Sequence, residues 1–160
     1  MHSLVVLQLL FLLMLANGTP IIAKKLLGRR YSYPLDGSLA FVDGRPVLGR
    51  SKTIRGVVTA VLVTTTGAAL IGLTWQVGTI VGSFAMAGDL FSSFCKRRLG
   101  LPSSSRASGL DQVPEAILPL IACHRLLAAA DIVICVVIFV IGEMVLSRLL
   151  YAVRLRDRPY

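Results

Sequence analysis

The sequence predicts an all-α integral membrane protein, a bundle of about five transmembrane helices. Of its 160 residues, 55% are hydrophobic and only 16% are charged, whereas an average soluble domain has about 25% charged residues. The mean hydropathy is +0.76, and most apolar residues lie in runs of about 20, the length that crosses a bilayer. These features exclude a soluble enzyme, a disordered tail and a basic DNA-binding domain, so we expect no nucleic-acid partner.

The first expected span covers residues 4–23. Its apolar run has the look of a secretory signal peptide, but no basic residue precedes it, and Lys24, Lys25, Arg29 and Arg30 follow it. This order of charges is typical of a retained span whose N-terminus lies outside. A cleaved signal peptide is the alternative.

Four further apolar runs are expected to cross the bilayer, so that residues 1–160 form a single membrane domain. They cover residues 57–75, 77–95, 113–130 and 132–150. The first two of these are almost continuous in hydropathy, and Trp75 and Gln76 mark the turn that we expect at the interface. The run over 113–130 is the least regular, because Pro119, His124 and Arg125 interrupt it.

The distribution of positive charge predicts the orientation of the bundle. Sixteen of the 17 Lys and Arg residues fall on one side of the membrane if all five runs cross it. The positive-inside rule then places the loops 24–56 and 96–112 and the tail 151–160 in the cytoplasm. We therefore expect a protein of the cytoplasmic (inner) membrane, with its N-terminus outside and its C-terminus cytoplasmic.

The first cytoplasmic loop, 24–56, is long enough to be functional or disordered. Apolar residues on both sides of Asp43-Gly44 predict a short β-hairpin, which favours an ordered loop. A basic segment from Arg50 to Arg55 leads into the second span. It could bind an anion, or it could serve only as a positive-inside anchor.

An ionisable group inside a span is the strongest indication of a functional site. Asp89 lies in the third span, about 10 Å along the helix axis before Lys96. A carboxylate at that depth must face the bundle or a water-filled cavity and find a partner. Ser93, Lys96 and Arg97 share its helical stripe.

Asp111 supplies a second carboxylate at the foot of the fourth span, where Gln112 and Glu115 follow it. Two Asp residues at the cytoplasmic ends of neighbouring helices, with cations between them, can hold Mg²⁺ while the cations neutralise phosphate. The alternative is that Asp111 caps the fourth helix.

Taken together, these motifs resemble those of the CDP-archaeol synthase family, membrane enzymes similar to the bacterial CDP-diacylglycerol synthases. The resemblance covers nearly the whole chain. Its most specific motifs are Gly88-Asp89-Leu90 with Ser93, Lys96-Arg97, and Leu110-Asp111-Gln112. Further matching segments are Ala16-Asn17, Pro34-Leu35-Asp36-Gly37, Asp43-Gly44-Arg45-Pro46, Lys52-Thr53 and Arg55-Gly56.

The resemblance implies a cytidylyltransferase that uses CTP to convert a membrane lipid phosphate to a CDP-activated lipid and releases pyrophosphate. It implies that Asp89 and Asp111 bind the metal, Mg²⁺, and that Lys96 acts with them in catalysis. The residues expected to bind nucleotide or lipid phosphate are Asn17, Lys52, Thr53, Arg55, Ser93, Arg97 and Gln112. The competing hypothesis is a non-enzymatic membrane scaffold or transporter subunit, which would need no buried carboxylates. Whether the lipid tails are isoprenoid ethers or diacyl chains stays open.

Overall fold

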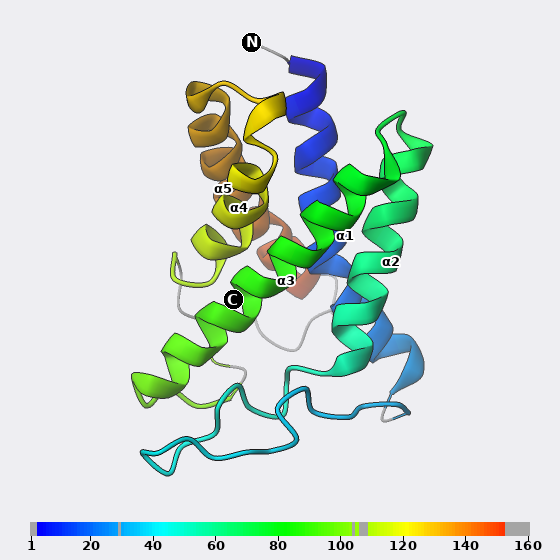
Figure 1. Ribbon diagram of the computed structural model, residues 1–160. Helices are drawn as coiled ribbons and strands as arrows, with labels where there is room; N and C mark the ends of the chain where they lie inside the picture. Colours follow the sequence, from blue (N-terminus) through cyan, green and yellow to red (C-terminus); the bar gives the residue numbers. More distant parts are fainter. Residues whose placement is uncertain (1–2, 29, 104, 106–108, 153–160) are drawn as a thin grey trace.

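The described part of the chain, in a computed structural model, consists of residues 3–28, 30–103, 105 and 109–152, with only the backbone described for 149–152. Within these residues the structure is helical and has no strands (Figure 1). The α-helices are α1 (Ser3–Leu27), α2 (Ile54–Leu70), α3 (Trp75–Arg98), α4 (Gln112–Ala122) and α5 (Ala129–Ala152). The expected all-α membrane fold is confirmed.

The helices differ in their capacity to cross a bilayer. Helices α1 and α3 and the Ala129–Arg148 part of α5 are long and apolar enough to span it, whereas α2 and α4 are shorter apolar helices of 17 and 11 residues. At 1.5 Å per residue, α4 extends about 16 Å, roughly half the hydrocarbon thickness. In Figure 1, α4 begins beside the middle of α3 and ends near the start of α1. The first residues of α4 therefore lie deep in the bundle.

The largest differences between the expected and observed helix boundaries lie at the ends of the second and fourth helices. The second helix was expected to reach Trp75, but it ends at Leu70 because Gly72 adopts a left-handed φ of 81° and the N–H of Leu73 turns back to the carbonyl of Ala68. Trp75 consequently starts α3. The continuous fourth helix expected over 113–130 instead ends at Ala122, and a 3₁₀ turn over His124–Leu126 separates it from α5.

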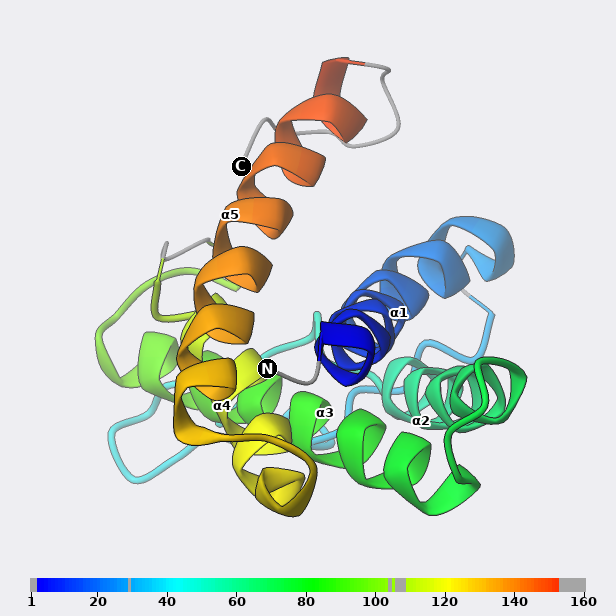
Figure 2. The same ribbon diagram turned by 90° about the horizontal axis from the view of Figure 1, so that it is seen from above.

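Glycines on α3 allow both neighbouring helices to approach it closely. A Cβ atom on Gly78 would lie 2.7 Å from the carbonyl oxygen of Thr64 in α2. A Cβ atom on Gly88 would lie 2.3 Å from the carbonyl oxygen of Pro114 and 2.7 Å from the nitrogen of Glu115, both at the start of α4. Small residues at such contacts are typical of helix packing in membranes. Figure 2 shows α3 between α2 and α4.

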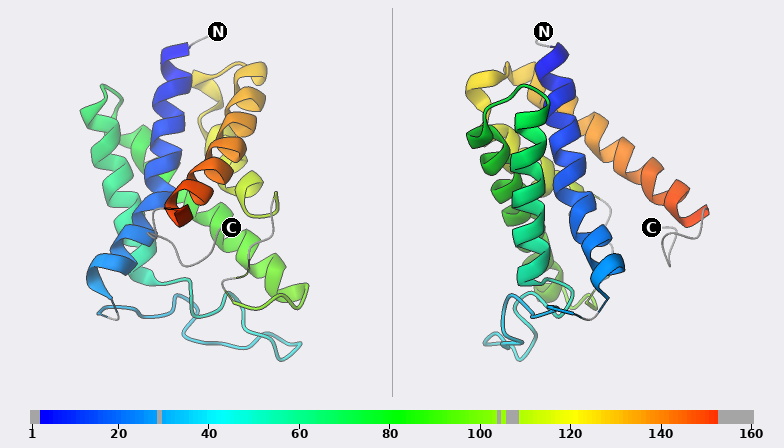
Figure 3. Two further views of the ribbon diagram at one scale, coloured as in Figure 1. Left: turned by 180° about the vertical axis from the view of Figure 1, so that it is seen from behind. Right: turned by 90° about the vertical axis from the view of Figure 1, so that its right-hand side faces the viewer.

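Helix α1 lies at the centre of the apolar core. Its side chains Leu9, Leu12 and Leu13 are fully buried. The same cluster includes Leu120 of α4 and Phe139 of α5. Figure 3 shows that α5 leans outward from the other helices along its length, so its second half has fewer neighbours in the bundle.

The first loop, residues 30–53, crosses the end of the bundle where α1 ends and α2 begins (Figure 3). The β-hairpin expected here is not formed as a pair of strands. Ala40 and Pro46 make an isolated antiparallel bridge, and the N–H of Phe41 donates to the carbonyl of Arg45 across the turn. The N–H of Val47 also donates to the carbonyl of Leu39, but the N–H of Leu39 bonds to the carbonyl of Asp36 instead of to Val47, so the pairing ends there.

The contact at Gly88 yields a test of the packing between α3 and α4. Gly88→Ala should lower the free energy of unfolding by about 1–3 kcal/mol, because the new methyl group meets rigid backbone. Gly142→Ala is the matched control, since a Cβ there meets nothing within 4 Å. Thermal unfolding in detergent measures both variants. Equal stability of the two would contradict the close contact at Gly88.

Candidate functional site

A cleft with a volume of about 550 Å³, lined in part by charged side chains, lies at the end of the bundle covered by the first loop. Its walls come from the last turns of α1, the start of α2, the middle of α3 and the loop itself. Four cationic side chains line it, Lys24, Arg50, Lys52 and Arg55, together with the carboxylate of Asp89. Cations concentrated in a partly enclosed cleft attract anionic ligands such as phosphates.

Lys52 and Asp89 form an ion pair in this cleft. The Nζ atom of Lys52 lies 2.5 Å from Oδ1 and 2.6 Å from Oδ2 of Asp89. The two side chains are 20% and 22% exposed. The intramembrane carboxylate thus has the partner that its depth requires, and that partner comes from the loop that precedes α2.

A second ion pair joins α3 to the start of α4. The Nζ atom of Lys96 lies 2.6 Å from Oδ1 of Asp111 and also donates to the carbonyl of Ser105, at 2.9 Å. These two side chains are more buried than the first pair, at 8% and 14% exposed. Asp111 makes no side-chain capping bond to α4, so the structure does not support the capping alternative.

Glu115 brings a third carboxylate to the same region. Its side chain is only 6% exposed, and it faces Asp89, with Glu143 and Lys52 also within electrostatic range. The close contact between Gly88 and the backbone of Glu115 explains this placement. The sequence analysis assigned no role to Glu115. Its position one helical turn after Asp111 was the feature of the sequence that could have indicated its place near the site.

The donor atoms at these two pairs suit Mg²⁺. In phosphate-transfer sites this ion takes one or two protein carboxylates and fills its remaining positions with phosphate oxygens and water. Asp89 and Asp111 offer such oxygens, and each already holds a cationic nitrogen against them. Within the described residues, no group of three or more His, Cys, Asp or Glu forms a ready-made metal cage. The residues therefore fit a metal that protein and phosphate hold together.

Thr53 and Arg55, expected to bind substrate, line the cleft and also organise its walls. The hydroxyl of Thr53 accepts the N–H of Gly56 at 3.2 Å and caps α2. The Nη1 atom of Arg55 donates to the carbonyls of Gly28 and Arg30, which fastens the end of α1 to the start of α2. With Lys52 and Asp89, these are the expected site residues that line the cleft.

The remaining expected residues lie outside the cleft lining. Asn17 is half-buried in α1 and donates to the carbonyl of Leu13 at 3.1 Å. Ser93 and Arg97 are buried in α3, at 2% and 4% exposed. The side-chain oxygen of Gln112 accepts the N–H of Gly109 at 2.7 Å, which fixes the segment that enters α4.

Asp36 anchors the first loop from within. Its carboxylate accepts the N–H groups of Ser38, Leu48 and Gly49 at 2.9–3.0 Å. Burial by itself raises the pKa of Asp36, but the hydrogen bonds from Gly49, Leu48 and Ser38 outweigh it and hold the pKa below its usual value. The sequence analysis identified Asp36 only as part of a matching motif and did not predict this anchoring role.

Arg98 fastens the outer part of the first loop to the end of α3. Its Nη1 atom lies 2.7 Å from Oδ1 of Asp43, and its guanidinium group lies over the rings of Phe41 and Phe94, at 4.5 and 5.0 Å. Arg45 donates in return to the carbonyl of Arg98 at 2.8 Å. The loop is thus held in place over the polar end of the bundle.

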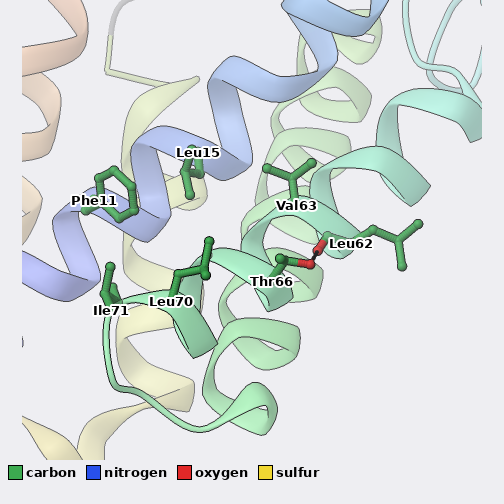
Figure 4. Close-up of a pocket in the computed structure, with 8 residues that line it drawn as sticks. Phe11, Leu15, Leu62, Val63, Thr66, Leu70 and Ile71 are labelled. Carbon is green, nitrogen blue, oxygen red and sulfur yellow. Dashed lines mark hydrogen bonds between the residues drawn. The ribbon is translucent and has the colours of Figure 1, made fainter.

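A second cavity, of about 410 Å³, lies between α1 and α2 and is apolar (Figure 4). Phe11 and Leu15 line it from α1 and Val63 from α2. The hydroxyl of Thr66 is bonded to the carbonyl of Leu62 in its own helix at 3.0 Å. With no free polar group directed into it, this groove suits hydrocarbon and offers nothing to a phosphate.

A bundle of membrane helices with a cation-lined cleft at one end defines an intramembrane protein whose cleft is suited to anionic ligands. The family model for CarS-like CDP-archaeol synthases matches residues 1–160. The CDP-archaeol synthase of Sulfurisphaera tokodaii is 36% identical over 135 residues, which cover 79% of this chain and 81% of that protein. The synthase of Hyperthermus butylicus is 38% identical over 104 residues, 61% of this chain and 59% of that protein. The chain belongs to the CarS-like CDP-archaeol synthase family.

A solved structure, described as an intramembrane enzyme for archaeal membrane lipid biosynthesis, has the same fold. It superimposes with a TM-score of 0.71 at 24% sequence identity and covers 84% of this chain and 89% of its own. Family membership makes this chain an integral membrane enzyme, a CTP-dependent cytidylyltransferase that acts on a lipid phosphate. The hypothesis of a non-enzymatic scaffold or transporter subunit is therefore not supported.

The anchoring of the first loop by Asp36 can be tested by removing the charge. Asp36→Asn puts an NH₂ group against backbone donors, so it should destabilise the loop by about 1–3 kcal/mol at neutral pH. Because folding lowers the pKa of Asp36, the wild-type anchor is complete above the usual Asp pKa and is lost as the pH falls below it, through the folded-state value. Hydrogen exchange at the amides of Leu48 and Gly49 measures the effect. Unchanged exchange in the variant would contradict the anchoring role.

Proposed function

We propose that the cleft and the adjoining Lys96–Asp111 pair form the reaction centre for cytidylyl transfer. The observation that carries this proposal is the convergence of Lys24, Arg50, Lys52 and Arg55 around the cleft that holds Asp89. The triphosphate of CTP carries several negative charges, and the lipid phosphate adds more. A cationic cleft where membrane helices end can receive both substrates, the nucleotide from the aqueous side and the lipid from the bilayer.

The reaction needs alignment and charge neutralisation more than a protein nucleophile. An oxygen of the lipid phosphate attacks the α-phosphorus of CTP, the bond from that phosphorus to the bridging oxygen breaks, and pyrophosphate leaves with the electron pair. Lys52 and Arg55 bind phosphate oxygens and neutralise the charge that builds on them. Thr53 positions the phosphates from the start of α2, whereas Ser93, which is buried in α3 outside the cleft lining, acts indirectly by supporting the helix that carries Asp89.

We assign Asp89 and Asp111 as the carboxylates that hold Mg²⁺, with Lys96 and Arg97 beside Asp111 as further cations. When bound, the ion neutralises phosphate oxygens and stabilises the departing pyrophosphate. The oxygen chemistry of both residues supports the assignment, as does their pairing with lysines, which shows that each position accommodates a cation. Asn17 and Gln112 act at greater distance, by fixing the local backbone on either side of the site.

We further propose that the cleft faces the cytoplasm in the inner membrane and that the N-terminus lies outside. The basic residues support this orientation, because the cation-lined end of the bundle also carries the basic ends of α1 and α3. CTP is a cytoplasmic metabolite, and the positive-inside rule favours the same side.

Reporter fusions test this orientation. A reporter that is active only in the cytoplasm should be active when it is fused after Tyr160. A reporter that is active only outside should be active when it is fused before Met1, because the basic connections favour the cytoplasm. Insertion of a reporter at Gly44, in the first loop, gives an internal check. An external location for the loop reporter would overturn the proposed topology.

Asp89 provides the direct test of the reaction centre. Asp89→Asn keeps the side-chain volume and removes the charge, so turnover should fall at least about 100-fold, which corresponds to about 2.7 kcal/mol of transition-state stabilisation. Pyrophosphate release, measured with CTP and lipid phosphate across a Mg²⁺ titration, reports the loss.

Asp43→Asn is the matched control, since it also removes the carboxylate of an ion pair. That pair is partly exposed, and such pairs contribute about 0–1 kcal/mol, so turnover should change less than about fivefold. Near-normal turnover of Asp89→Asn at saturating Mg²⁺, or activity lost only in step with thermal stability, would refute the assignment.

A further inference from the structure

The ammonium group of Lys52 occupies the position on Asp89 that a metal ion bound by this carboxylate would take. Its Nζ atom contacts both oxygens of Asp89, at 2.5 and 2.6 Å, instead of binding one oxygen from the side. A divalent cation that used either oxygen would meet the ammonium group at close range. The ammonium group takes up the lone pairs between the two oxygens, and it would repel a divalent cation on either outer lone pair, so the two cations compete for Asp89.

The surroundings of the pair favour a cation at this position. Glu115 is 94% buried and faces Asp89, and Glu143 of α5 lies within electrostatic range of Glu115. Carboxylates grouped in a low-dielectric interior repel one another unless positive charge lies between them. The side chains of Glu115 and Asp89 are also hydrogen-bonded, which relieves part of this repulsion, and a divalent cation would restore the positive charge that a departing ammonium group removes.

The backbone of Lys52 is fixed, and its side chain can move. The N–H of Lys52 donates to the carbonyl of Gly49 at 3.1 Å, and its carbonyl accepts the N–H of Leu35 at 2.8 Å. The four-carbon side chain is flexible and carries a point charge with three donors. Arg50, Ser51 and Thr53 line the same cleft, so an ammonium group released from Asp89 stays among the groups that face a phosphate.

We propose that Lys52 is an exchangeable counter-cation of Asp89. It holds the carboxylate until a divalent cation takes its place, and its ammonium group then moves to a phosphate of the bound nucleotide. The inference deepens the proposed function, because it rests on Asp89 as a metal-binding residue. It adds a coupling that the assignment alone does not contain: the metal must displace Lys52, and the nucleotide gives Lys52 its new partner.

This exchange makes metal and nucleotide binding cooperative. Without nucleotide, the metal competes with Lys52 and binds weakly. With nucleotide bound, the ammonium group is drawn to phosphate and the competition is relieved, so each ligand strengthens the binding of the other by the same factor. A lysine that only neutralises phosphate would leave metal binding without nucleotide unaffected or weakly hindered by its charge.

Direct binding of Mn²⁺, followed by its electron paramagnetic resonance signal in detergent-solubilised protein, tests the exchange without any turnover. Lys52→Met should bind Mn²⁺ alone at least about tenfold more tightly than wild type, within the usual range of coupling between sites. The same variant should bind CTP more weakly at saturating Mn²⁺. CTP should also strengthen Mn²⁺ binding less in the variant than in wild type.

Lys24→Met is the matched control. It removes the same charge from the same cleft, but Lys24 is exposed and is not the residue bonded to Asp89. Mn²⁺ affinity should then rise less than about threefold, the effect of a screened charge at a distance. Equal gains in Lys24→Met and Lys52→Met would overturn the exchange and leave only a general electrostatic effect.

Comparison of Asp89→Asn with Lys52→Met separates failure of this inference from failure of the proposed function. If Asp89→Asn abolishes Mn²⁺ binding and Lys52→Met does not strengthen it, the metal site stands and the exchange is refuted. If Asp89→Asn leaves Mn²⁺ binding unchanged, the metal assignment falls and the exchange falls with it. Lys52→Gln serves where Lys52→Met does not fold, and thermal unfolding with and without Mn²⁺ gives an independent measure of affinity.

Discussion

The compensation of charge inside the bundle is the constraint on which the rest of the structure depends. Helix α3 carries the carboxylate of Asp89 within its apolar part and the buried ammonium group of Lys96 in its last turn, and neither charge is stable there without a partner. Their partners come from outside the helix: Lys52 from the loop before α2 and Asp111 from the segment before α4. Two ion pairs thereby join two separate segments of the chain to α3.

Close contacts between helices allow these ion pairs to form. The carbonyl of Pro114 lies where a Cβ of Gly88 would be, so the first turn of α4 is pressed against α3 beside Asp89. A larger residue at position 88 would move Glu115 and Asp111 away from their present neighbours. The shortness of α4 also brings polar residues into the bundle. Because this helix starts half-way into the bundle, its first residues lie at a depth that a full span would fill with apolar residues.

Hydropathy and charge predicted the long apolar helices, whose length matches the bilayer. They did not predict the helix ends, which depend on local backbone geometry. The runs that became α1, α3 and α5 are long and apolar, so their existence follows from composition. The end of α2 depends on the left-handed conformation of Gly72, and the end of α4 on a 3₁₀ turn that no periodicity announces. Asp89 and Lys52 were each predicted as site residues, but their pairing was not, because it depends on the path of a 24-residue loop.

The same charges serve the fold and the proposed chemistry, and this explains how a reactive cleft can exist inside a membrane protein. An unpaired Asp89 would cost the bundle several kcal/mol, whereas one held permanently by Lys52 would bind a metal ion only weakly. A lysine on a flexible side chain satisfies both demands, since the ion pair stabilises the fold and stays exchangeable at a fifth of full exposure. The Lys96–Asp111 pair is more buried and is further held by the carbonyl of Ser105. Exchange should therefore occur at the Lys52–Asp89 pair, which opens onto the cleft. The more buried Lys96–Asp111 pair should preserve the packing of α3 and α4 during this exchange.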